Sequence, residues 1–351
     1  MVRRILVLST VVVAFALLGY VTLLHTQSPP ASKTTLASRA PAQNLDAVGS
    51  YFHAIFADDG DDASEDDDAW PADVDSPEQV LYEQPAMVRR AVADLAAPTA
   101  GKVNLYLLAF AGDGEENVFR NEVEYVAKLF DKRFAGTGHS LVLVNNPATL
   151  AHHPLATLSN LELAADGIAA KMDRDRDILM LFLTSHGSRD HLLYVSMDPL
   201  PLDQIAPEDL ADVLAETRVR YKVVVISACY SGGFIDALKS PTTLVIAAAR
   251  KDRSSFGCGT DSPITDFGRA YFADALNQTA SLTSAFTLAS KLVDRWETRD
   301  REKHSYPQIA SSSKIEAQLA AWRRDVPLGP PIPFKADSKA ETTAAEASKK
   351  K

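Results

Sequence analysis

Two apolar segments in the middle of the chain predict a pair of neighbouring buried strands. Residues 178–185 and 223–228 are apolar up to their last positions and do not alternate with polar residues, a pattern typical of central strands covered on both faces. Residues 207–216, which lie between them, carry apolar positions at helical spacing. This strand–helix–strand order predicts two parallel strands whose carboxyl ends lie at one edge of the sheet.

The alternation of strands and helices continues on both sides of this pair. Further strands are expected at 103–110, 140–145 and 243–249, an extended piece at 306–310, and helices at 117–134, 158–172, 234–238, 267–277 and 282–298. Residues 191–196 are compatible with a short hairpin beside the same sheet edge. The pattern predicts an α/β fold with a mostly parallel central sheet between two layers of helices.

The N-terminus predicts a membrane segment. Arg3 and Arg4 precede residues 5–24, which contain no charged side chain and are long enough to cross a bilayer as a helix, for which about 20 residues are needed. We expect residues 1–26 to form an uncleaved anchor with the arginines on the cytoplasmic side. The alternative is a cleaved signal segment.

Residues 27–100 predict a largely flexible acidic linker, since residues 58–68 collect like charges that resist compaction. Two short helical patterns, 45–56 and 77–95, are compatible with packing on the domain or with lying apart from it. The prolines and lysines at the end of the chain predict a disordered tail. The predicted organisation is therefore an anchor (1–26), a linker (27–100), a folded domain (101–326) and a tail (327–351).

Composition narrows the possible functions. The chain has 351 residues, of which 46% are hydrophobic, enough for one large domain with appendages. Its net charge of −10 argues against nucleic-acid binding, and two cysteines are too few for a disulfide framework. The absence of a G-x-S-x-G motif excludes the usual serine hydrolase of this sheet class. No cofactor and no metal is predicted, because the acidic positions of 173–177 lead directly into a strand and His152–His153 lacks partner ligands.

Each strand of the central pair ends in a residue that can do chemistry. His186 follows the first strand and Cys229 the second, and an imidazole close to a thiol generates the reactive thiolate. The alternative is that Cys229 is a small core residue and His186 a turn residue. Gly187 and the glycines of 231–233 favour the chemical interpretation, because they let backbone N–H groups approach a ligand. Cys229 is also expected to open a helix whose dipole favours the thiolate.

These segments resemble the legumain-type cysteine peptidases. The resemblance rests on Ser-His-Gly-Ser at 185–188, Ser-Ala-Cys-Tyr-Ser-Gly at 227–232 and Ser-Ser-Phe-Gly-Cys at 254–258. It covers residues 103–322 and looks most like the bacterial, membrane-anchored members of the family. It implies a caspase-like three-layer α/β/α sandwich, with the domain in the periplasm behind a single inner-membrane helix, or secreted if the segment is cleaved.

The resemblance also implies the catalytic roles. Cys229 would be the nucleophile and His186 the general acid and base, while the backbone N–H groups of Gly187 and Cys229 would hold the oxyanion. The family requires no third residue to orient its histidine. Cys258 matches a cysteine of the family's pocket loop and is expected to be free or structural, although a disulfide with Cys229 would inactivate the enzyme.

Three residues are expected to bind the substrate side chain: Ser254, Asp266 and Tyr230. Legumains carry an acidic residue where this chain has Tyr230, and an Arg-His pair expected after the first strand is replaced by Gly112–Gly114. A buried carboxylate needs a donor, so Asp266 is expected to meet a polar substrate residue, Asn or a small residue first and Lys or Arg second. Asn specificity is not implied as strongly as in legumains.

The expected function is hydrolysis of peptide bonds in a peptide or protein substrate through a His-Cys dyad and a thioester. The same residues fit a transamidase or ligase that transfers the acyl group to an amine. A third possibility is a catalytically silent binding domain tethered to the membrane, against which the presence of both His186 and Cys229 argues. The sequence does not indicate an oligomeric state.

Overall fold

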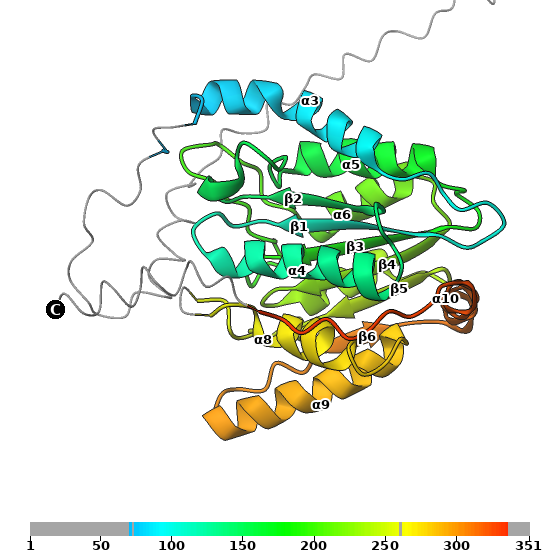
Figure 1. The fold of residues 1–351 in the computed structure, drawn as a ribbon. Helices are drawn as coiled ribbons and strands as arrows, with labels where there is room; N and C mark the ends of the chain where they lie inside the picture. The colour runs from blue at the N-terminus through cyan, green and yellow to red at the C-terminus, as the bar shows by residue number, and fades with distance from the viewer. Residues whose placement is uncertain (1–69, 72–73, 260–261, 336–351) are drawn as a thin grey trace, which may run out of the picture. The chain divides into compact units, whose positions relative to one another are not determined.

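The computed structural model describes residues 70–71, 74–259 and 262–335 (Figure 1). The expected anchor, the acidic run at 58–68 and the helical pattern at 45–56 lie outside these residues. Within the described part, none of the helices combines the length and the apolar character needed to cross a bilayer.

The described residues form a six-stranded sheet in the order β2-β1-β3-β4-β5-β6. The strands are β1 (Leu105–Ala111), β2 (Ser140–Val144), β3 (Ile178–Thr184), β4 (Tyr221–Ser227), β5 (Thr243–Ala247) and β6 (Gln308–Ala310). The first five are parallel and β6 pairs antiparallel with β5. Every predicted strand is therefore present, and the mostly parallel sheet is confirmed.

Helices cover both faces of this sheet (Figure 1). They are α3 (Pro77–Asp94), α4 (Asn117–Arg133), α5 (Leu158–Lys171), α6 (Pro207–Glu216), α7 (Ile235–Leu238), α8 (Asp266–Gly268), the π-helical η3 (Arg269–Ala275), α9 (Leu282–Asp300) and α10 (Ser313–Asp325), with 3-10 turns at η1 (Pro147–Thr149) and η2 (Ser231–Phe234). One core contains α4, α8, η3, α9 and α10, and the other α3, α5, α6 and α7. This arrangement fits the expected caspase-like sandwich.

The sequence pattern explains the two cores. Successive side chains of a strand point to opposite faces, and along β1 Leu105 and Leu107 enter one core while Tyr106 and Leu108 enter the other. Both sets must be apolar, which is why the central strands do not alternate. Burial of each Leu or Phe side chain stabilises the folded state by about 1.5–3 kcal/mol. The central strands therefore hold a layer of helices on each face of the sheet.

The domain includes a helix that the sequence assigns to the linker. In α3, the Gln84 Oε1 accepts hydrogen bonds from the Leu155 backbone N at 2.7 Å and from the Asn160 Nδ2 at 2.9 Å. Val88 of the same helix is buried in the core beside α5. Of the two expectations for residues 77–95, packing on the domain is the correct one, and the domain begins well before residue 101.

The chain end also differs from expectation, because residues 327–335 pack on the domain instead of forming a tail. Tyr125 donates its hydroxyl hydrogen bond to the Ile332 carbonyl at 2.7 Å, and Arg133 donates from Nη1 to the Gly329 carbonyl at 2.8 Å. The Phe334 ring meets the Tyr125 ring edge-on. Residues 336–351 lie outside the described part.

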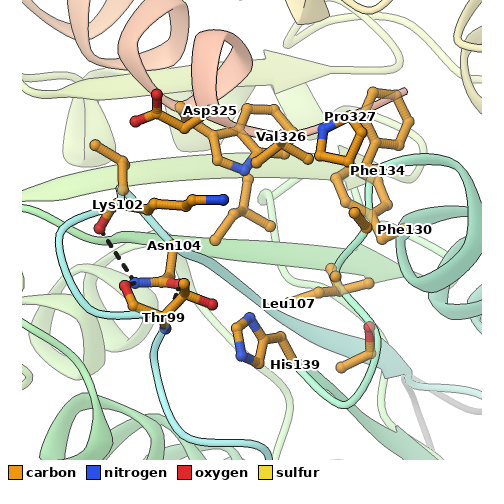
Figure 2. Close-up of a pocket in the computed structure, with 16 residues that line it drawn as sticks. Thr99, Lys102, Asn104, Leu107, Phe130, Phe134, His139, Asp325, Val326 and Pro327 are labelled. Atoms are coloured by element: carbon orange, nitrogen blue, oxygen red, sulfur yellow. Dashed lines mark hydrogen bonds between the residues drawn. The ribbon is translucent and has the colours of Figure 1, made fainter. Parts of the chain in front are cut away.

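A small cavity of about 130 Å³ lies at the amino ends of β1 and β2. Figure 2 shows Lys102 and Asp325 on the side of the cavity away from Phe130 and Phe134. Ligands of parallel sheets bind at the carboxyl ends of the strands. This cavity lies at the opposite end of the sheet from His186 and Cys229.

Candidate active site

The structure brings His186 and Cys229 to neighbouring strand ends, as predicted. Strands β3 and β4 are in register up to Thr184 and Ser227. His186 and Cys229 each follow two residues later. The backbones touch there: a Cβ on Gly187 would lie 2.1 Å from the Cys229 carbonyl oxygen. Only glycine fits this close approach.

The Cys229 thiol is held in a loop that favours its anionic form. The Ser255 backbone N–H donates to Cys229 Sγ at 3.2 Å. The pKa of Cys229 is lowered to about 6, first by hydrogen bonding from the Cys258 thiol and then, against the opposing effect of burial, by the Ser255 N–H and the charge of His186. The pKa of Cys258 is raised in turn, because it donates to Cys229. Both cysteines are free thiols.

His186 lies between an aromatic ring and two carboxylates. Its Nε2 is 3.4 Å from Asp113 Oδ2 and 3.4 Å from Glu116 Oε2, and its ring meets Phe119 edge-on with the centroids 5.1 Å apart. Burial and the neighbouring Glu116 raise the pKa of Asp113 well above its usual range. Burial alone would also raise the pKa of Glu116, but interaction with His186 and Asp113 lowers it. Asp113 therefore holds a proton more readily than Glu116.

A buried carboxyl group joins the elements beneath this pair. Glu122 of α4 is fully buried and accepts hydrogen bonds from Thr184 Oγ1 at 3.0 Å and Thr265 Oγ1 at 3.1 Å. The Thr265 hydroxyl is also 3.0 Å from Ser227 Oγ. Burial raises the pKa of Glu122 to about 8. One side chain thus connects the end of β3, the end of β4 and the start of α8.

Two backbone N–H groups, those of Gly187 and Cys229, lie just after the ends of β3 and β4. Among the described residues, none accepts a hydrogen bond from the N–H of Gly187 or Cys229, although the neighbouring Tyr194 N donates to the His186 carbonyl at 3.0 Å. Donors that are held in place and not used within the protein are suited to stabilising a developing oxyanion.

The glycines after Cys229 have a different role from the one expected. The Gly232 N donates to the Ala249 carbonyl at 2.8 Å, and a Cβ on Gly233 would lie 2.1 Å from the His191 ring. They allow close packing and do not expose N–H groups to a ligand. Nor does Cys229 open a helix: Tyr230 is left-handed with φ 56° and a 3-10 turn precedes α7.

The three expected pocket residues are only partly brought together. Ser254 donates its hydroxyl hydrogen bond to the Tyr230 hydroxyl at 3.4 Å, on the loop that also holds Cys229. Asp266, at the start of α8, lies against Gly257, where an added Cβ would be 2.7 Å from Oδ1. Its carboxylate, whose pKa is raised by burial, lines a cavity of about 540 Å³ together with Arg269. Neither Ser254 nor Tyr230 is among the described residues that line that cavity.

Sequence reasoning did not identify Asp113, Glu116 or Glu122. A signal existed for each: residues 113–116 follow the predicted strand 103–110, and the carboxyl ends of parallel strands lie at the same sheet edge as His186. Glu122 sits on the apolar face of α4 beside Phe119 and Val123, where a carboxylate is costly unless partnered.

A thiol with a lowered pKa, an imidazole and unused backbone donors at one sheet edge define an enzyme of the cysteine-nucleophile class, which attacks acyl carbons through a thiolate. Residues 163–317 match the Peptidase C13 family. This segment contains both His186 and Cys229, and the match confirms the resemblance to the legumain-type cysteine peptidases. No curated protein matches the chain. Asp113, Glu116 and Glu122 lie before the matched segment.

Proposed function

We propose that the chain is a cysteine endopeptidase that cleaves peptide bonds through a thioester on Cys229. The observation that carries the proposal is the lowered pKa of this thiol, about 6, next to His186 within the family segment. At neutral pH most of such a thiol is present as the nucleophilic thiolate. Cysteine peptidase activity in general is supported by the family match, and the positions of His186 and Cys229 after neighbouring strands support the proposed dyad mechanism.

The reaction would proceed in two steps. The Cys229 sulfur attacks the scissile carbonyl carbon, and the N–H groups of Gly187 and Cys229 stabilise the oxyanion. Protonated His186 gives its proton to the leaving amine as the C–N bond breaks, which leaves an acyl thioester. His186 then takes a proton from water, the hydroxide attacks the thioester, and the acid product and the thiolate are released.

Substrate recognition is proposed at Ser254, Tyr230 and Asp266. The Ser254–Tyr230 hydroxyl pair next to Cys229 offers hydrogen bonds to a polar side chain, and Asp266, at the start of α8, offers an acceptor beside Gly257. These features favour a polar residue before the cleaved bond, either Asn or a small residue, with Lys or Arg second. Asp266→Ala should weaken cleavage of the preferred peptide and spare thiol labelling at Cys229.

A peptide library assayed by mass spectrometry tests the activity and reports the preferred residue. Cys229→Ala should abolish both turnover and labelling by an active-site electrophile even though Cys258 remains, and His186→Ala should leave a thiol of much lower reactivity. Full turnover by the Cys229→Ala variant would end the peptidase interpretation. Adding a peptide with a free amine distinguishes hydrolysis from transamidation. Hydrolysis of the thioester gives the free acid, whereas transamidation joins the acyl group to the added amine.

We also propose that the protein is held in the inner membrane by residues 5–24, with the catalytic domain in the periplasm. Support comes from the uncharged run behind Arg3 and Arg4. The intact protein should remain in the membrane fraction at high salt, and its domain should be digested only from the outer side. A soluble protein starting near residue 27 would show instead that the segment is cleaved.

A further inference from the structure

Asp113, Glu116 and His186 place three potential metal ligands together. One carboxylate oxygen of Asp113, one of Glu116 and a ring nitrogen of His186 all lie within 4.8 Å of one another. The two carboxylate oxygens come from the turn after β1, and His186 comes from the turn after β3, the neighbouring strand. The set is buried to different degrees: the Asp113 side chain is 1% exposed, His186 11% and Glu116 18%.

The separations fit metal coordination better than direct hydrogen bonding. A charge-assisted N–H···O bond is about 2.7–2.9 Å long, whereas His186 Nε2 is 3.4 Å from each carboxylate oxygen. In a tetrahedral zinc site with bonds of about 2.0–2.2 Å, neighbouring ligand atoms are about 3.3–3.5 Å apart. Glu116 Oε2 is buried, and the Glu116 carboxylate interacts with both His186 and Asp113.

The surroundings support the ligands as well. The Glu115 N–H donates to Asp113 Oδ1 at 3.1 Å, which fixes this carboxylate with Oδ2 toward His186. The Phe119 ring fixes the imidazole plane. Outer contacts of this kind orient the ligands of metal sites. One imidazole and two carboxylates suit Zn²⁺ better than Ca²⁺ or Mg²⁺, which prefer six or more oxygen ligands.

We propose that Asp113, Glu116 and His186 form an inhibitory binding site for a divalent transition-metal ion, Zn²⁺ in the first place, with a fourth position open to water. The ion occupies Nε2 of His186 and prevents this ring from moving protons for Cys229. Binding of the ion does not depend on the proposed function. The inhibition does rest on it, because His186 must act as the acid and base.

Zinc titration by calorimetry tests the site in the full-length protein. Cys229→Ala, which has no thiolate nucleophile, should bind one Zn²⁺ at this site with the affinity of the unaltered protein. Asp113→Asn and Glu116→Gln should each weaken this binding at least about tenfold, since one of three ligands is lost. Asp190→Asn, an exposed carboxylate in the loop after His186, and His152→Ala with His153→Ala should bind like the unaltered protein.

Two further measurements make the result decisive. Co²⁺ bound to the Cys229→Ala and unaltered proteins should give the same four-coordinate spectrum without a sulfur-to-cobalt charge-transfer band. Thermal unfolding of the apo variants confirms that they are folded, and Glu116→Gln, the more exposed position, keeps the test valid if Asp113→Asn does not fold. Loss of the binding in Cys229→Ala, or a sulfur band in the unaltered protein, would assign the ion to a His186–Cys229 pair and overturn the proposal. Unchanged affinity in Glu116→Gln would also overturn it.

Inhibition is measured separately on active protein. Zn²⁺ should block peptide cleavage reversibly, a chelator should restore it, and the concentration for half inhibition should rise about tenfold in Glu116→Gln, in parallel with the loss of affinity. Zinc binding in a protein without peptidase activity would leave the site intact and remove only the proposed function. Inhibition that is equally sensitive in Glu116→Gln would remove the site.

Discussion

At the scale of single residues, Cys229 and Cys258 act as one ionisable pair. Replacing Cys258 by Ala removes the hydrogen bond that contributes most to the low pKa of Cys229, so this pKa should rise from about 6 toward its usual value of 9.0. The rate of alkylation at pH 6 should fall by at least about fivefold, because the thiolate fraction falls with each unit of pKa. Alkylation measured across pH gives the pKa directly.

The matched control is Cys258→Ser, whose hydroxyl keeps a donor at the same position and should retain part of the effect. An alkylation profile of Cys258→Ala that coincides with that of the unaltered protein would show that the Ser255 N–H and His186 suffice to stabilise the thiolate.

Glu122 gives the second residue-scale prediction, which concerns pH and stability. Its folded pKa, about 8, lies above the usual 4.5, so between these values the folded state holds a proton that the unfolded state has lost. The free energy of unfolding should therefore fall as pH rises from about 4.5 to 8, by up to about 1.4 kcal/mol per pH unit from this group. Glu122→Gln stays neutral and should flatten that slope in urea unfolding. Glu78→Gln, exposed on α3, should not.

The reactive pair could be predicted from the sequence, but its surroundings could not. His186 and Cys229 each follow an apolar strand of one strand–helix–strand unit, where chain order fixes their proximity. Asp113 and Glu116 meet His186 because β1 pairs with β3 and not with another strand, and local periodicity does not contain that information. The resemblance implied no third residue beside His186, so it did not predict these carboxylates.

At the scale of elements, hydrophobic periodicity correctly predicted the buried strands and most of the amphipathic helices. Strands buried on both faces and amphipathic helices such as α4 and α6 were found within a few residues of their expected ends. The expectation for residues 191–196 was less accurate, since Leu193 only bridges Gly187 and Ile205 and no hairpin strands form. Helix α10 was missed, although Ile315, Leu319 and Trp322 show a helical repeat and are buried in the core. This helix lies inside the predicted domain, 101–326, in a stretch for which no element was predicted.

Helix α3 provides a prediction at this scale. Gln84→Ala would leave the buried donors of Leu155 and Asn160 without their acceptor, and each unsatisfied donor costs about 1–3 kcal/mol. The free energy of unfolding should fall by about 2–4 kcal/mol in a urea titration. Gln79→Ala, on the exposed side of the same helix and bonded to Glu83, is the control and should have little effect. Equal losses in both variants would mean that α3 is not held on α5 by these contacts.

At the scale of the molecule, segments distant in sequence complete the domain. The family match ends at residue 317, yet residues 327–335 lie against α4 and η3, as the Gly329 and Ile332 contacts show. The Arg133 guanidinium is buried and donates to the carbonyls of Leu276, Asn277 and Gly329. A charge at such a position is tolerated only when its donors are satisfied.

Two truncated chains distinguish the contribution of residues 327–335 to stability from that of residues 336–351. Ending the chain at Lys335 keeps every contact of residues 327–335 and should leave the thermal midpoint of the domain unchanged. Ending it at Val326 removes the acceptor of one Arg133 donor and the Ile332 carbonyl partner of Tyr125, and it exposes the ring face that Phe334 covers. The loss should be about 2–4 kcal/mol, since hydrogen bonds to charged groups contribute about 1.5–3 kcal/mol and aromatic contact adds to this. Tyr125→Phe in the full chain removes the hydroxyl bond to Ile332 and the one accepted from Asn277 Nδ2 but keeps the Arg133 and Phe334 contacts, and it should lie between the two truncations. If the Val326 and Lys335 proteins unfold together, residues 327–335 contribute nothing to the domain.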